Sequence, residues 1–134
     1  MRKELPFASE VLALTSMLPG ESVPHPRSYG TFARKIGRFA IEDKVISLEQ
    51  AIRSASGLPA DILRLPRRGY IKVGYHADLV VFDPKTFRDK ATFDKPHQYS
   101  TGVQYLFING RLAIDQGRST AILAGRVLRH NQKD

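Results

Sequence analysis

Apolar residues in the first half of the chain recur at helical spacing. The aromatic and aliphatic side chains at i, i+4 and i+7 after Thr31 predict a helix with one apolar face, which Thr31 would cap. That face comprises Phe32, Ile36 and Phe39. The loop 17–30 before it contains prolines at 19, 24 and 26, which we expect to exclude a helix and to stiffen the backbone. Farther upstream, the apolar run 11–14 predicts one short buried strand.

A second helix is predicted after Ser47. Ser47 and Gln50 form a capping-box pattern ahead of an apolar stripe, and Gly57 is a natural stop at its end. The stripe comprises Leu48, Ala51, Ile52 and Ala55. Pro59 then opens a short helical turn.

From residue 69 onward the pattern changes to one typical of strands. The run 79–82 is continuously apolar, so we expect a strand covered on both faces. Residues 103–117 predict a hairpin, because Asn109 and Gly110 suit the positive-φ positions of a type I′ turn. Residues 119–129 are predicted as a last extended segment. Helices followed by strands predict an α+β fold in two pieces, 1–66 and 67–134.

Composition and charge narrow the function classes. The 134 residues suit one domain, and 21 basic against 13 acidic residues give a net charge of +8. This charge permits anionic partners, but the basic residues are scattered, so we do not expect nucleic-acid binding. We expect no membrane span, because no apolar run approaches about 20 residues, and the patch 11–14 is too short for a signal peptide. We therefore expect a cytoplasmic protein, and the absence of cysteine excludes disulfides and a thiol nucleophile.

Five segments, in order, resemble the N-acyl-D-amino-acid deacylases (D-aminoacylases) of the amidohydrolase superfamily. They are "HPRSYGTFARKIGRF", "SLEQAIRSASGLPADIL", "ADLVVFDPKTFRDKATF", "YSTGVQYLFINGRLA" and "GRVLR". The resemblance implies a metal-dependent (β/α)8 barrel beside a composite β-sandwich. It implies that this chain corresponds to a C-terminal portion, with the last barrel strand and helices followed by C-terminal strands of the sandwich.

The resemblance also implies where the catalytic groups should lie. The family binds zinc through a His-x-His pair and other ligands, and this chain has only the separated histidines His25, His76, His97 and His130. We therefore expect no metal ligands here. The family's catalytic aspartate is expected near Ser16 or Met17, and neither a hydroxyl nor a thioether is a useful base at neutral pH.

The loop "HPR" supplies the candidate binding residues. By resemblance, Arg27 holds the α-carboxylate of the substrate, a task that suits the two parallel donors of a guanidinium. A salt bridge from Arg27 to the following helix is the structural alternative. His25 is a second binding candidate or an exposed loop residue, and Tyr29 is expected to pack. Asp78 is expected to accept backbone N–H bonds, and His76 to have no chemical role.

The resemblance thus implies a zinc hydrolase that cleaves the amide of an N-acyl-D-amino acid. This chain would contribute Arg27 and a scaffold, but neither metal nor base, so we expect the isolated chain to be inactive and to bind no zinc. The alternative is a non-catalytic β-rich module for interaction or oligomerisation. Without the rest of a barrel, apolar faces would be exposed, so we expect a homo-oligomer, most simply a dimer.

Overall fold

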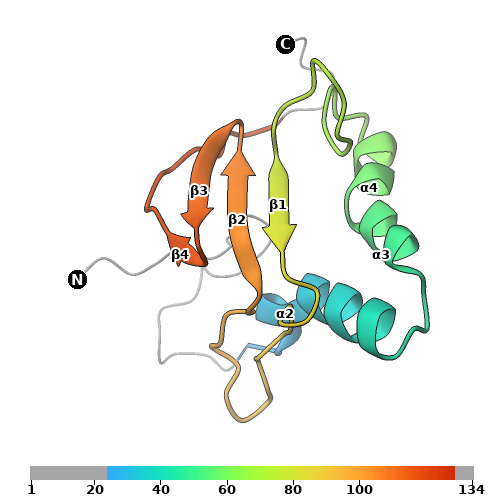
Figure 1. Ribbon diagram of the computed structural model, residues 1–134, viewed down its shortest axis with the longest axis vertical. Coiled ribbons are helices and arrows are strands. Elements are labelled where there is room, and N and C mark those ends of the chain that lie inside the picture. The colour runs from blue at the N-terminus through green and yellow to red at the C-terminus, as the bar shows by residue number, and fades with distance from the viewer. Residues whose placement is uncertain (1–23, 129–134) are drawn as a thin grey trace.

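A computed structural model describes residues 24–128, in which helices precede an antiparallel sheet (Figure 1). The helical elements are α2 (Arg27–Ala33), the π-helix η1 (Arg34–Glu42), α3 (Leu48–Ala55) and α4 (Gly57–Ile62). The strands are β1 (Leu79–Phe82), β2 (Val103–Ile108), β3 (Arg111–Asp115) and β4 (Arg118–Ser119), ordered β1-β2-β3-β4. The predicted strand 11–14 and the positions of Ser16 and Met17 lie outside the described residues.

The first helix begins earlier than the sequence pattern predicted. Helix α2 starts at Arg27, directly after Pro26, whose carbonyl accepts the Gly30 N–H at 3.1 Å. Proline has a fixed φ that suits the first turn of a helix, so the prediction that the prolines exclude a helix up to residue 30 is wrong for its last residues. Thr31 does not cap this helix; its hydroxyl donates to the carbonyl of Arg27 at 2.6 Å.

The buried face of α2 and η1 also differs from the predicted one. Phe32 and Phe39 are 42% and 41% exposed, and small residues are buried instead. The buried positions are Tyr29, Gly30, Ala33, Gly37 and Ala40. The physical reason is a close backbone approach: a Cβ built on Gly37 would lie 2.1 Å from the carbonyl oxygen of Phe87. The helix therefore lies directly on the segment that follows β1.

Helix α3 begins and ends as predicted, but one residue of its predicted apolar stripe is exposed. The Ser47 hydroxyl accepts the Gln50 N–H at 3.1 Å, which confirms the cap, and Ala51 is completely buried. Ile52, however, is 41% exposed. Gly57 follows the last turn of α3, as predicted, and also opens α4. A Cβ on Gly57 would meet the Tyr70 ring at 2.8 Å, so this position requires glycine.

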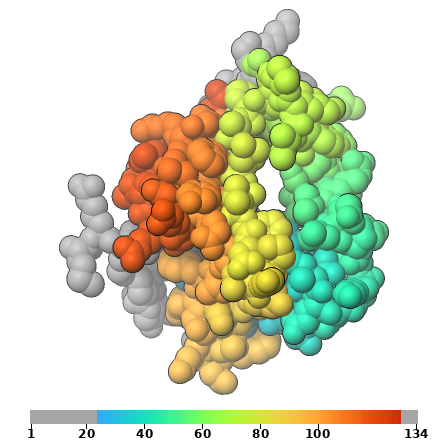
Figure 2. Space-filling view, in the orientation of Figure 1, coloured from blue at the N-terminus to red at the C-terminus, as the bar shows by residue number. Residues whose placement is uncertain are grey.

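The hairpin is confirmed, with Asn109 (φ 50°) and Gly110 (φ 76°) at its turn between β2 and β3. Strand β1 pairs with β2 alone among the described strands, and its Val80 and Val81 are 50% and 49% exposed. The prediction that β1 is covered on both faces is therefore wrong for this chain. Figure 2 shows an opening between β1 and α3. Among residues 24–128, no large side chain is completely buried.

The segment predicted as extended after residue 119 is mostly irregular. Strand β4 ends at Ser119, and Ala121 adopts a positive φ of 59°. Two antiparallel residue pairs, Ile114 with Ser119 and Asp115 with Arg118, hold β4 to β3. The predicted division at 66–67 stays a prediction.

Candidate functional site

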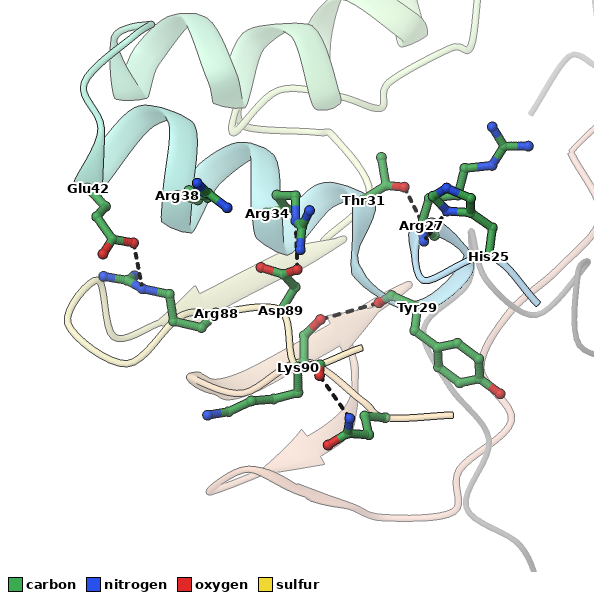
Figure 3. A network of polar contacts seen from close by, with 12 residues as sticks. His25, Arg27, Tyr29, Thr31, Arg34, Arg38, Glu42, Arg88, Asp89 and Lys90 are labelled. Atoms are coloured by element: carbon green, nitrogen blue, oxygen red, sulfur yellow. Dashed lines mark hydrogen bonds and ion pairs between the residues drawn. The ribbon is translucent and has the colours of Figure 1, made fainter. Parts of the chain in front are cut away.

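Arg27 is the first residue of α2, and its exposed side chain points away from the ion pairs of the helix (Figure 3). Its guanidinium forms neither an ion pair nor a hydrogen bond with any residue of 24–128. The salt bridge considered as its structural role is therefore absent from this part of the chain. A free guanidinium at a fixed helix start can accept an anionic partner in a bidentate geometry.

His25 lies beside Arg27 on the same turn. The His25 Nδ1 accepts the backbone N–H of Arg27 at 3.1 Å, and the ring packs edge-on against Phe93 with centroids 5.0 Å apart. Because Nδ1 acts as an acceptor, the neutral ring carries its proton on Nε2. The turn thus presents two donors, the Arg27 guanidinium and the His25 Nε2–H, and both suit a carboxylate.

Ion pairs hold the helix onto the segment after β1. Arg34 Nε lies 2.8 Å from Asp89 Oδ2, and Arg88 Nε lies 3.6 Å from Glu42 Oε2 (Figure 3). The Asp89 carboxylate is largely buried, whereas the Arg34 side chain is half-exposed. These contacts, with the close approach at Gly37, give the Arg27 turn a fixed position relative to the sheet.

The turn that leaves β1 is stabilised by the Asp83 side chain. Its two carboxylate oxygens accept the Lys85 N–H at 2.9 Å and the Thr86 hydroxyl at 3.0 Å. The backbone bond from Lys85, then the hydroxyl of Thr86, lowers the pKa of Asp83 below its ordinary value. Asp83 therefore stays ionised at neutral pH and orders the segment that carries Phe87 and Asp89.

A second polar cluster lies at the hairpin turn. The Asp78 carboxylate accepts the Asn109 N–H at 2.7 Å and a hydrogen bond from Arg68, as expected for a structural acid. Arg68 is 9% exposed and also donates to the Asn109 side chain at 2.6 Å. Beside this cluster is a hollow of about 320 Å³ lined mainly by β1, β2 and the segment 125–128. No local pattern in the sequence pointed to Arg68, because its partners lie 10 and 41 residues away.

The histidines of the described residues do not converge. His76 Nε2 contacts Arg126 at 3.1 Å, whereas His97 Nδ1 contacts the Tyr29 hydroxyl at 2.9 Å. Within 24–128 no three His, Asp or Glu side chains form a group that could hold a metal. These residues therefore do not fit the zinc site that the resemblance implies. The contact of His76 with Arg126 was not predicted from the sequence.

No helix in the part of the chain that the structure describes is long and apolar enough to cross a membrane.

The described residues thus combine an antiparallel sheet with flanking helices and the exposed arginine of "HPR" at the start of α2. The sequence profile of the Amidohydrolase family matches residues 18–114, and the chain belongs to this family. It is similar to the N-acyl-D-aspartate deacylase of Alcaligenes xylosoxydans xylosoxydans, with 43% identity over 111 residues. It is also similar to a D-aminoacylase of the same organism, with 41% identity over 111 residues. The predicted resemblance is thus confirmed.

Solved structures of D-aminoacylases and related deacylases also match this chain. A D-aminoacylase crystal structure has a TM-score of 0.76 and 39% identity, and the match covers 81% of this chain and 23% of that one. An N-acyl-D-glutamate deacylase from Bordetella bronchiseptica, complexed with zinc and a phosphonate that mimics the tetrahedral intermediate, has a TM-score of 0.68 and 37% identity. That match covers 80% of this chain and 23% of the deacylase.

The chain spans less than a quarter of the relatives that it matches. The match covers 83% of this chain but only 22% of the N-acyl-D-aspartate deacylase and 23% of the D-aminoacylase. The similarity therefore concerns one part of those enzymes.

Proposed function

We propose that this chain forms the carboxylate-binding part of a zinc-dependent hydrolase that cleaves the amide of N-acyl-D-amino acids. The observation that carries the proposal is the Arg27 guanidinium, which is exposed at the start of α2 and has no partner within 24–128. The named relatives act on N-acyl-D-aspartate and N-acyl-D-glutamate, compounds that carry a free α-carboxylate. A carboxylate is the group that a free guanidinium binds best.

The chemistry assigned to this turn is binding and orientation. The two parallel donors of Arg27 take both oxygens of the α-carboxylate, and the His25 Nε2–H provides a further donor beside them. Holding the carboxylate fixes one end of the substrate, so the scissile amide is directed to one place. The residues that would bind zinc, and the catalytic base, would lie in polypeptide outside residues 24–128.

The architectural part of the proposal follows the resemblance. Residues 1–66 would complete a (β/α)8 barrel, and residues 67–134 would form strands of a composite β-sandwich, as in a C-terminal portion of a deacylase. The incomplete cover of β1 supports this, because Val80 and Val81 have a half-exposed surface that a second sheet would bury.

A hybrid enzyme tests the role of Arg27. Residues 18–114 would replace the matching segment of the Alcaligenes D-aminoacylase, with hydrolysis of an N-acetyl-D-amino acid as the assay. Arg27→Met should lower kcat/KM by about a hundredfold, mainly through KM, because a charge-assisted bond to the substrate is lost. Arg27→Lys should restore only part of it, since an ammonium has no planar fork.

The matched control in the hybrid is Arg111→Met, an exposed arginine on β3 that should leave kcat/KM unchanged. An equal loss in both variants, or no loss in Arg27→Met, would contradict the assignment of Arg27. A folded hybrid without any deacylase activity would also contradict it.

The second candidate function is a non-catalytic interaction module, and the exposed apolar surface favours it for the isolated chain. Val80, Val81, Phe32 and Phe39 are each about half-exposed. Surfaces of this kind invite pairing with another chain. We expect the purified chain to sediment as a homodimer at tens of micromolar; a strictly monomeric mass would rule out self-association as the cover of these faces.

A further inference from the structure

Tyr29, two residues after Arg27, is held by a loop that lies far along the sequence. Its side chain is almost buried, at 6% exposure, and its hydroxyl shares a hydrogen bond of 2.9 Å with His97 Nδ1. The His97 ring meets the Tyr29 ring edge-on at 5.6 Å, and Tyr99 lies 5.7 Å from it on a tilted plane. Both partners belong to the segment between β1 and β2.

The same loop also contacts the residue on the other side of Arg27. Phe93 packs against the His25 ring with centroids 5.0 Å apart, and the Ser100 hydroxyl donates to the Tyr29 carbonyl at 3.3 Å. His25 and Tyr29, which flank Arg27 at two residues on either side, are therefore anchored to one loop. The Arg27 side chain itself remains exposed.

The loop has internal bonds that make it a firm support. Its base is closed by the antiparallel bridge between Arg88 and Thr101. Inside it, the Gln98 amide donates to the carbonyls of Lys90 at 2.9 Å and Lys95 at 2.8 Å. A compact loop with its ends together and its interior bonded is an Ω-loop, a form that often has a functional role.

We propose that this loop, residues 90–100, positions Arg27 for substrate binding and that His97 is its positioning residue, acting through the Tyr29 hydroxyl. The inference rests on the proposed function of Arg27. Fixing the backbone on both sides of the guanidinium lowers the entropy that binding would otherwise cost, which is how a preorganised site gains affinity. His97 touches neither substrate nor metal in this role.

Amide hydrogen exchange of the full chain, measured by NMR, tests the proposal. The reporters are the N–H groups of Ser28, Tyr29 and Gly30, which bond the carbonyls of His25 and Pro26. Tyr29→Phe and His97→Ala should each speed their exchange about five- to tenfold, since one part-buried hydrogen bond is lost. The double variant should exchange no faster than His97→Ala alone, because both changes remove the same bond.

His97→Asn provides the rescue, because its amide can occupy the place of Nδ1, and it should exchange within about twofold of the parent chain. The Ala60 amide of α4 is the reference and should not change in any variant. Unchanged reporters, additive single effects, or an equal acceleration at Ala60 would overturn the positioning role. This readout does not depend on substrate: if the turn loosens as expected while Arg27→Met leaves the hybrid's kcat/KM unchanged, the positioning of the turn is supported and the proposed function fails.

Discussion

The Gly37→Ala variant should lose at least about 3 kcal/mol of unfolding free energy, the upper end of the range for overpacking. A Cβ on Gly37 would lie 2.1 Å from the Phe87 carbonyl oxygen and 3.1 Å from its carbonyl carbon. These are backbone atoms, so they cannot move aside as a flexible side chain would. The helix must shift away from the segment after β1, which also separates Arg34 from Asp89.

Urea denaturation followed by circular dichroism measures this loss. Gly125→Ala is the matched control, because no atom lies within 4 Å of the Cβ that it adds, and its stability should change little. A Gly37→Ala chain as stable as the parent would show that η1 does not lie on residue 87 in solution.

The Arg68→Leu variant should lose about 3 kcal/mol of stability, the lower end of the range for breaking a buried ion pair. Arg68 is 9% exposed, and its removal leaves the Asp78 carboxylate and the Asn109 side-chain oxygen without their shared donor. The loss should stay near the lower end because the Asp78 side chain is 36% exposed, so water can solvate it in part. Thermal unfolding should show a clear fall in Tm.

Two further variants make the Arg68 experiment specific. Arg68→Leu combined with Asp78→Asn should recover part of the loss that Arg68→Leu shows alone, since no unpaired charge remains. Arg118→Leu, which changes an exposed arginine of β4, should have little effect. If the double variant is as unstable as the sum of the two single variants, the pair is not the source of the stability.

Local signals were enough to predict some elements from the sequence. The Ser47 cap and the Asn109–Gly110 turn depend on residues within four positions of each other, and both are confirmed. The buried face of α2 and η1 was not predictable in this way. It depends on Phe87, some fifty positions away, whose backbone selects glycine and alanine over the larger Phe32 and Phe39.

The same contrast between local and distant contacts applies to the candidate site. Arg27 and His25 could be selected from the sequence because they stand in a recognisable motif. His97 could not be linked to them, since its contact with Tyr29 spans 68 residues. The aromatic density of the loop, with Phe93 and Tyr99 near His97, was the one local hint of an anchor.

The Asn109–Gly110 turn has a consequence for how the protein ages. Asn-Gly pairs deamidate when the glycine nitrogen attacks the asparagine side-chain carbonyl and closes a succinimide ring. Here the Gly110 N–H is bonded to the Ala77 carbonyl at 2.9 Å, while the Asn109 amide contacts Arg68 at 2.6 Å and the Ala124 carbonyl at 2.8 Å. Both reacting groups are held in place in the folded chain and released in the unfolded one. The fraction of Asn109 that is deamidated in a stored sample would therefore increase with the time that the molecules had spent unfolded.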